Sequence, residues 1–243
     1  MIETSRFGVP AEWAFTTGEL VPVLYKIVIR YYDHLLKWYK GEYRTYEKDG
    51  KKIFDPKMEY QPILLIGPPG CGKSMTVFSI AEQVSKTLSK IYDMKIKLDV
   101  IDLRISQLDP TDIKGLPMRP EKVRISIDEI TRRFREIKRR LKGEEKPVPS
   151  EVEEEIVKWA LPEFLPRKGL GILFLDEINL GAPSVLAACY QLILDRKVGK
   201  YELPPGWIVI AAMNPPEQAE IASPLPPPLI NRFRTIYVIP ERA

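Results

Sequence analysis

The sequence predicts an α/β fold with a central parallel sheet flanked by helices, on three observations. Short, continuous apolar runs, typical of strands covered on both faces, alternate with stretches whose apolar residues keep helical spacing. Glycine-rich or acidic residues directly follow two of these runs, where parallel sheets bind their ligands. The chain of 243 residues is long enough for one sizeable core. We expect this core to span residues 61–243, after an extension of residues 1–60.

The extension is expected to hold a helix and a hairpin. Thr16-Thr-Gly-Glu19 has the pattern of a capping box, although Pro22 favours a helix that starts a few residues later. A stripe of apolar residues at helical spacing follows: Leu24, Ile27, Tyr31, Leu35 and Trp38. Residues 43–54, around Asp49-Gly50, favour a β-hairpin. We expect the helix to pack on the core.

The first core strand, Pro62–Ile66, leads into a glycine-rich segment, GPPGCGKS, that fits the pattern G-x-x-x-x-G-K-[ST]. Helical spacing resumes after it at Val77, Ile80, Ala81, Val84, Leu88 and Ile91. The order strand, turn, helix is typical of a phosphate-binding loop, in which main-chain N–H groups and the helix dipole face the phosphates. Lys73 would reach the β- and γ-phosphates, and the Ser74 hydroxyl would bind Mg²⁺. The predicted nucleotide-binding residues are Gly67, Pro68, Pro69, Gly70, Cys71, Gly72, Lys73, Ser74 and Met75.

A second strand, Ile96–Leu103, is followed by an insertion at residues 119–150. Apolar residues at helical spacing predict a helix there: Ile127, Ile130, Phe134, Ile137 and Leu141. Its other face is basic, since residues 119–142 contain ten Lys and Arg against four Asp and Glu. Ser150 is expected to cap a further helix from Glu151. The basic face is either a solvated surface or a contact for an acidic partner or nucleic acid.

The third strand, Gly171–Leu175, ends in two carboxylates. Carboxylates at the carboxyl end of a parallel strand lie at the edge where ligands bind. Asp176 could therefore meet the Mg²⁺ that Ser74 binds, and Glu177 could deprotonate an attacking water. We interpret the pair as the metal ligand and the general base of nucleotide hydrolysis.

Two polar residues accompany the last strands. Asn214 follows the strand Trp207–Ala212 and could hydrogen-bond the water or the γ-phosphate, or could be only a turn residue. Arg232 precedes the strand Thr235–Ile239 and, taken alone, is an ordinary surface charge. Neither position alone assigns a catalytic role; the order of all the segments together makes both residues candidates.

The order of these segments resembles the AAA+ ATPases, and within them the MoxR group, over residues 61–240. GPPGCGKS resembles the Walker A motif, ILFLDE ending at Glu177 resembles Walker B, and AAMNP with Asn214 resembles sensor 1. LINRF with Arg232 resembles the segment that carries the arginine finger. The segment SQLDPTDIKG, residues 106–115, and the Asn-Pro-x-Glu run from Asn214 are similar to the MoxR group in particular.

The resemblance implies a P-loop NTPase core of five parallel strands in the order 5-1-4-3-2. It implies a ring, commonly a hexamer, with ATP bound between neighbouring subunits. Arg232 would reach the γ-phosphate of the next subunit, and Arg234 is the alternative finger. The segment Phe7-Gly8-Val9 would lie against the adenine, and residues 114–118 occupy the place of a substrate-gripping pore loop or form a simple turn.

Two further expectations concern the segment before sensor 1 and the C-terminal end of the sequence. Residues 196–204 form a short hairpin before sensor 1, a feature that helicase-like relatives use on DNA. AAA+ modules normally continue into a small helical lid with a sensor 2 arginine, whereas this sequence ends at Ala243 directly after the fifth strand. We therefore expect no lid in these residues; truncation, a lid on another chain and a different closure are the alternatives.

Composition narrows the functional classes. The net charge of +4 gives no warrant by itself for nucleic-acid binding. Two cysteines, Cys71 and Cys189, do not make a disulfide framework, and the apolar run at residues 20–29 is too short and too interrupted to span a membrane. We expect a cytoplasmic protein without membrane contact.

The sequence thus predicts Mg²⁺-dependent hydrolysis of ATP by a homo-oligomeric ring that remodels or assembles protein partners. A motor directed to nucleic acid is the first alternative. A scaffold that binds ATP with little turnover is the second.

Overall fold

The computed structural model describes residues 14–42, 46–48, 51–126, 151–157, 159–215 and 225–240. The chain divides into two compact units. The first combines Met1–Lys114 with Pro162–Ala243, and the second is Gly115–Leu161. The proposed adenine contact at Phe7-Gly8-Val9 lies outside the described residues.

A six-stranded parallel sheet forms the centre of the first unit. Its strands in spatial order are β1 (Ala14–Thr16), β14 (Arg234–Ile239), β4 (Ile63–Ile66), β13 (Trp207–Met213), β10 (Gly171–Asp176) and β5 (Asp99–Arg104). The five core strands therefore have the predicted order 5-1-4-3-2, and the P-loop NTPase fold of the AAA+ type is confirmed. The predicted number of strands was one too low, because β1 adds to the edge by pairing with residues 237–239.

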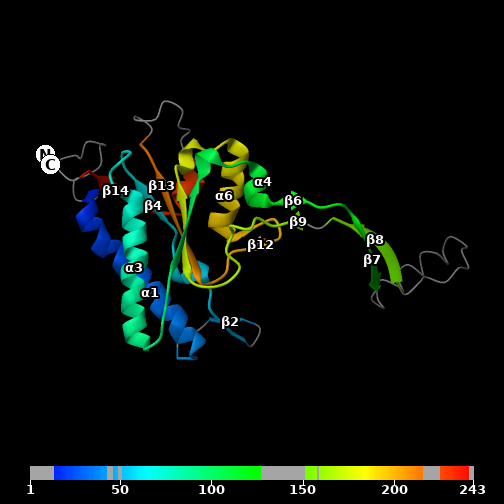
Figure 1. Ribbon diagram of the computed structural model, residues 1–243, viewed down its shortest axis with the longest axis horizontal. Coiled ribbons are helices and arrows are strands. Elements are labelled where there is room, and N and C mark those ends of the chain that lie inside the picture. Colours follow the sequence, from blue (N-terminus) through cyan, green and yellow to red (C-terminus); the bar gives the residue numbers. More distant parts are fainter. Residues whose placement is uncertain are drawn as a thin grey trace, which may run out of the picture. The chain divides into compact units, whose positions relative to one another are not determined.

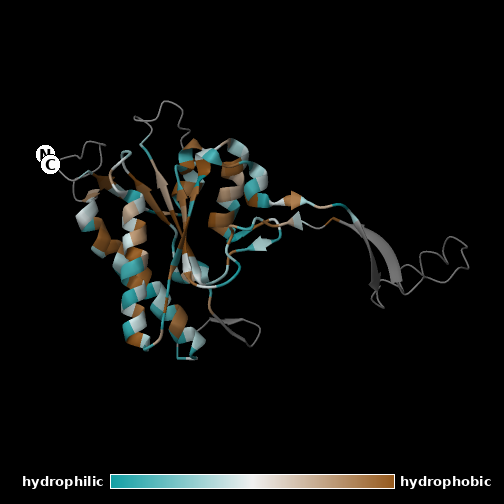
Figure 2. Ribbon diagram, in the orientation of Figure 1, coloured by the Kyte–Doolittle hydropathy of each residue, from teal (hydrophilic) through white to brown (hydrophobic). Residues whose placement is uncertain are grey.

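Helices cover both faces of this sheet (Figure 1). The long helices α1 (Thr17–Tyr39) and α3 (Lys73–Tyr92) pack together on one face. The helices α4 (Pro110–Lys114) and α6 (Pro183–Asp195) lie on the other. Apolar residues concentrate on the strands and on the helix faces turned toward them (Figure 2). The apolar residues that keep helical spacing in α3 are buried, except Ile91, which is exposed in the last turn.

Helix α1 begins with the predicted capping box. The Thr16 hydroxyl accepts a hydrogen bond from the Glu19 main-chain N–H, and the Glu19 carboxylate accepts one from Thr16. The helix therefore starts at Thr17 and includes Pro22, so the expectation of a later start was wrong. The reciprocal cap provides hydrogen-bond partners in the first turn of the helix. This stabilisation outweighs the loss of the one main-chain N–H donor that proline lacks.

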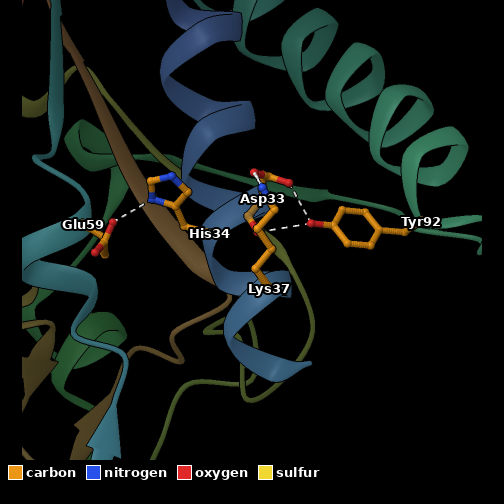
Figure 3. Close-up of polar contacts among 5 residues, drawn as sticks. All are labelled: Asp33, His34, Lys37, Glu59 and Tyr92. Atoms are coloured by element: carbon orange, nitrogen blue, oxygen red, sulfur yellow. Dashed lines mark hydrogen bonds and ion pairs between the residues drawn. The ribbon is translucent and has the colours of Figure 1, made fainter. Parts of the chain in front are cut away.

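Polar side chains join α1 to its neighbours (Figure 3). The His34 ring lies 2.9 Å from a Glu59 oxygen at the end of the short helix α2 (Pro56–Glu59). The Tyr92 hydroxyl, on α3, donates to Asp33 Oδ1 over 2.7 Å, and Lys37 donates to the other Asp33 oxygen over 2.7 Å. These contacts fix the helix in one rotational setting on the core.

The smaller elements of the first unit lie, in the sequence, between the strands of the central sheet. The predicted hairpins are confirmed as β2 (Tyr46–Lys48) with β3 (Lys51–Ile53) and β11 (Lys197–Val198) with β12 (Tyr201–Glu202). Three short helical segments also occur: η2 (Ile105–Gln107), η3 (Ile178–Leu180) and α7 (Pro227–Ile230). Cys71 and Cys189 are buried free thiols. Across the described part of the chain, no helix combines the length and the apolar character needed to cross a bilayer.

In the second unit, the described residues include two antiparallel strand pairs. β6 (Leu116–Pro117) pairs with β9 (Trp159–Ala160), and β7 (Glu121–Ser126) pairs with β8 (Glu151–Ile156). The prediction of a helix from Glu151 was wrong, because main-chain pairing with β7 overrides the helical preference of the glutamates. The helix expected at residues 127–141 lies outside the described residues, and the described part of the insertion, residues 119–126, includes strand β7.

Candidate active site

The glycine-rich segment lies at the carboxyl end of β4 and continues into α3. Gly70 and Gly72 have positive φ angles of 77° and 84°, a region that side chains with a Cβ rarely adopt. Gly72 is the N-cap of α3 and has no side chain that could accept a hydrogen bond from the first N–H groups of the helix. A Cβ on Gly67 would lie 2.5 Å from the Val238 carbonyl oxygen, so β14 also requires glycine there. This arrangement suits a phosphate group.

Lys73 lies inside the loop with its ammonium group bonded to main-chain carbonyls. Its Nζ donates to the Gly67 oxygen over 2.7 Å and to the Pro68 oxygen over 2.9 Å. It also donates to Asn214 Oδ1 over 3.1 Å. Burial lowers the pKa of Lys73, because the charged form loses hydration. The lysine is therefore a poorly hydrated cation held beside the loop, which favours binding of an anion there.

Ser74 and the two carboxylates at the end of β10 form the opposite wall. The Ser74 hydroxyl donates to Asp176 Oδ2 over 3.2 Å, and the Glu177 N–H donates to Asp176 Oδ1 over 2.9 Å. Partial burial and the negative charge of Asp176 raise the pKa of Asp102 on neighbouring β5, which indicates a local excess of negative charge. A hydroxyl and carboxylates are hard oxygen donors of the kind that Mg²⁺ prefers.

The donor set is consistent with a partly hydrated ion. Among the described residues there is no group of three or more His, Cys, Asp or Glu that could hold a metal by itself. Mg²⁺ usually keeps several waters and takes one or two protein ligands plus phosphate oxygens. Ser74 and Asp176 therefore fit the ion in combination with a nucleotide.

Glu177 has an unusual main-chain conformation. Its φ angle is 53°, in the left-handed region that is strained for a residue with a side chain. Its carboxylate accepts a hydrogen bond of 2.5 Å from the Ser106 hydroxyl on η2. Strain of this kind persists where the surrounding structure enforces it, often at reactive sites. The conformation sets where the candidate base points, and Ser106 holds it.

Asn214 is joined to the segment after Glu177 by a buried contact. The Asn179 side chain, almost fully buried, donates from Nδ2 to the Asn214 main-chain oxygen over 3.0 Å. Asn179 Oδ1 has no partner among the described residues. The pair couples the segment after β13 to the segment that follows the two carboxylates at the end of β10.

The extension contributes to the site as well. The Thr17 hydroxyl, in the first turn of α1, donates to the Cys71 main-chain oxygen over 2.7 Å. The Thr17 side chain also lies 3.4 Å from the position of a Cβ on Gly72. The first turn of α1 therefore braces the glycine-rich loop from outside.

These residues enclose a cavity of about 310 Å³. Its wall is formed by Pro69, Gly70, Cys71, Gly72, Lys73, Ser74, Met75, Asp176, Glu177 and Asn214. The structure thus brings together nearly all candidate site residues, and Gly67 and Pro68 contribute the carbonyls that hold Lys73.

Arg232 does not belong to this cavity. It lies in the turn between α7 and β14, at the amino end of the sheet, where Arg234 pairs with Ile63. The glycine-rich loop follows Ile66 at the other end of β4. Strand β4 has 4 residues. At about 3.3 Å per residue it separates the two positions by roughly 13 Å.

Three side chains with contacts to the site were not assigned roles from the sequence: Thr17, Ser106 and Asn179. Their partners are distant along the chain: Glu177 lies 71 positions from Ser106, and Cys71 lies 54 positions from Thr17. Asn179 follows Glu177 closely, and a polar residue among apolar neighbours was the one available signal.

The chain is similar to 317 chains of solved structures, of which two serve as examples. One, from Cytophaga hutchinsonii ATCC 33406, is provisionally described as an ATPase; it is 21% identical, with a TM-score of 0.40, covering 73% of this chain and 41% of its own. The other is PCH-2 of C. elegans, 13% identical with a TM-score of 0.45, covering 93% of this chain and 43% of its own. The chain thus spans about two fifths of the length of each.

No curated protein matches the sequence. Residues 63–241 match the family described as "ATPase family associated with various cellular activities (AAA)". The match covers well over half of the chain and includes every strand of the sheet except β1. By this match, the chain belongs to the AAA family of ATPases.

Proposed function

We propose that the protein hydrolyses ATP with Mg²⁺ in the cavity between the glycine-rich loop and the Asp176–Glu177 pair. The observation that carries this proposal is the approach of Ser74 Oγ to Asp176 Oδ2, at 3.2 Å, with Glu177 next in the chain. Two oxygen ligands and a separate carboxylate are what hydrolysis requires beyond nucleotide binding. Mg²⁺, when bound by Ser74 and Asp176, would supply charge stabilisation on the phosphates.

The other residues have distinct roles in this proposal. Lys73 exchanges its main-chain carbonyl partners for the β- and γ-phosphates. Glu177 orients the attacking water and takes its proton. Asn214, already within hydrogen-bond distance of Lys73, orients the water or the γ-phosphate. Ser106 occupies one Glu177 oxygen before the nucleotide binds.

We further propose a ring, of the MoxR type and commonly hexameric, in which neighbouring copies share each ATP site. Support comes from the place of Arg232 at the amino end of the sheet, roughly 13 Å along β4 from its own loop. A side chain there serves a neighbour more readily than its own copy. Arg234 remains the alternative finger, since it is exposed at the same end.

The work driven by hydrolysis is proposed to be the remodelling or assembly of protein partners in the cytoplasm. Leu116 and Met118 support this proposal, because their side chains are 57% and 54% exposed in the segment after Lys114. Exposed apolar side chains on and directly after the short strand β6 suit contact with a polypeptide. The alternative of a nucleic-acid motor is supported by the β11–β12 hairpin, whose Lys197 and Lys200 are exposed.

The test separates binding from turnover. Glu177→Gln should keep ATP affinity and lose hydrolysis, because Asp176 remains to bind Mg²⁺. Lys73→Ala should lose affinity. Wild-type ATPase activity is then measured with an unfolded protein, with DNA and with neither. Stimulation by the unfolded protein supports remodelling of protein partners, stimulation by DNA supports a nucleic-acid motor, and little turnover in all three supports a scaffold. Normal turnover in Glu177→Gln would remove Glu177 from the mechanism, and undiminished affinity in Lys73→Ala would contradict the phosphate-loop assignment.

A further inference from the structure

A second cavity lies at the amino end of the sheet, away from the glycine-rich loop. Its volume is about 400 Å³, within the usual range of ligand pockets. Pro62, which directly precedes β4, and Arg232, which precedes β14, are part of its wall. The hydrolysis proposed above uses none of its residues except Arg232. The cavity therefore needs its own explanation.

The charges on this wall have one sign. Lys57, Arg196 and Arg232 are cationic, and Gln61 and Asn231 add amide donors. No lining residue is an Asp or Glu. The rest of the wall is largely apolar: Tyr60, Pro62, Ile193, Leu194 and Val209. Cations in a concave surface with low-dielectric walls focus a positive potential and attract anions.

Arg196 is the most unusual of the three cations. It is 8% exposed, and its guanidinium donates from one nitrogen, Nη2, to the main-chain oxygens of Pro204 (2.9 Å) and Trp207 (2.6 Å). No carboxylate of the described residues contacts it. Burial lowers its pKa, and its electrostatic neighbours are tyrosines. Buried charges are normally paired, so this cation lacks the anion that its burial calls for.

The other two cations are available to a ligand. Lys57 Nζ lies 3.5 Å from Asp195 Oδ1, and the two side chains are 49% and 61% exposed. An exposed pair of this kind contributes little and exchanges easily. Arg232 is exposed and forms no ion pair with any residue that the structure describes. Both can reorient toward an anion without breaking a strong interaction.

We propose that this cavity binds the phosphate group of an organic phosphate, with Lys57, Arg196 and Arg232 as its cationic ligands. A carboxylate would offset one of these charges, whereas a phosphate monoester carries about two negative charges and three acceptor oxygens. The planar guanidinium matches phosphate oxygens in pairs. The apolar wall suits the organic part of the ligand.

Two sources can provide this phosphate. One is an organic phosphate free in solution. The other is the nucleotide held by a second copy of the chain, and that source rests on the function proposed above. Lys57 and Arg196 would then act on the same phosphates as Arg232. The experiment has one arm for each source.

The first arm uses phenyl phosphate as the probe and Lys73→Ala as the background, so that the glycine-rich loop contributes little. Calorimetric titration should give one saturable site per chain. Adding Lys57→Gln should weaken binding at least about fivefold, since one of three cations is removed. Adding Lys197→Gln is the matched control: this lysine is also exposed and paired with an exposed carboxylate, Glu202, at 3.3 Å, but it lies outside the cavity.

The second arm uses ATP and the Glu177→Gln protein at concentrations where it assembles. The rate at which an acetylating reagent modifies Lys57 is measured by mass spectrometry. ATP should lower that rate at least fivefold at Lys57 and leave Lys197 unchanged. The protection should disappear in the Lys73→Ala protein, because no copy then holds the nucleotide.

The outcomes separate the two claims. A saturable phenyl phosphate site that depends on Lys57 supports the cavity even if the wild-type protein hydrolyses no ATP. ATP-dependent protection without phenyl phosphate binding assigns the phosphate to the second copy. Failure of both arms, or an equal effect of Lys197→Gln, overturns the proposal.

Discussion

Thr17→Val tests whether the N-terminal helix supports the nucleotide site. The hydroxyl of Thr17 donates to the Cys71 main-chain oxygen over 2.7 Å, inside the glycine-rich loop. Valine keeps the shape of threonine beside Gly72 and removes only this hydrogen bond. A hydrogen bond of this kind contributes about 0.5–1.5 kcal/mol, which corresponds to roughly 2- to 12-fold in an equilibrium constant.

We therefore expect the Kd for ATP to rise by about 2- to 12-fold, and the Tm to fall by roughly 1–6 °C for a protein of this size. Fluorescent nucleotide titration and thermal unfolding measure the two effects. Thr17→Ser keeps the hydroxyl and should resemble wild type. Unchanged ATP affinity in Thr17→Val, or an equal loss in Thr17→Ser, would refute the bracing role of α1.

Three further predictions follow from single contacts. Gly67→Ala should lower the Tm, because its Cβ would meet the Val238 carbonyl oxygen at 2.5 Å, and an unchanged Tm in thermal unfolding would show that β14 can move away. Ser106→Ala should raise basal ATP turnover by up to about tenfold, since it frees the Glu177 oxygen. Ser106→Thr keeps the hydroxyl and is the control. A lower turnover in Ser106→Ala would mean that Ser106 positions the base for catalysis. Burial raises the pKa of Tyr32, so the stabilising contribution of the neutral phenol is complete below the unfolded pKa of about 10 and is lost as pH rises beyond it. In denaturant titrations from pH 8 to about 11, the free energy of unfolding should therefore decline less in Tyr32→Phe than in wild type. Identical declines with pH in the two proteins would count against this origin.

Local sequence determined most of the candidate site. The glycine-rich loop and the Asp176–Glu177 pair are each contiguous, and both directly follow apolar strands, so their meeting at one edge follows from parallel topology. The contacts that refine the site are different. Ser106 reaches Glu177, and Thr17 reaches Cys71, only because distant segments fold together. No periodicity or spacing reports such pairs.

The wrong predictions have the same cause. Residues 151–156 are rich in glutamate and favour a helix locally, yet pairing with β7 makes them a strand. Residues 14–16 are too few to show alternation, and they become a strand only because the edge of β14 accepts them. The cavity around Arg196 could not be predicted from the sequence for a related reason. Its wall combines residues from three distant segments, 57–62, 193–209 and 231–232.

The central claim is that ATP is cleaved with Glu177 of one copy and Arg232 of its neighbour. It is tested by mixing two inactive proteins, Arg232→Ala and Glu177→Gln, under conditions where mixed assemblies are shown to form. Each variant alone should bind ATP and turn it over poorly, because an arginine supplied by a neighbour contributes roughly 10³- to 10⁵-fold in related phosphate transfer.

In mixtures, ATPase activity should recover, since some interfaces combine an intact Glu177 with an intact Arg232. No recovery at any mixing ratio would contradict the shared site. Recovery with Arg234→Ala, but not with Arg232→Ala, would instead assign the finger to Arg234.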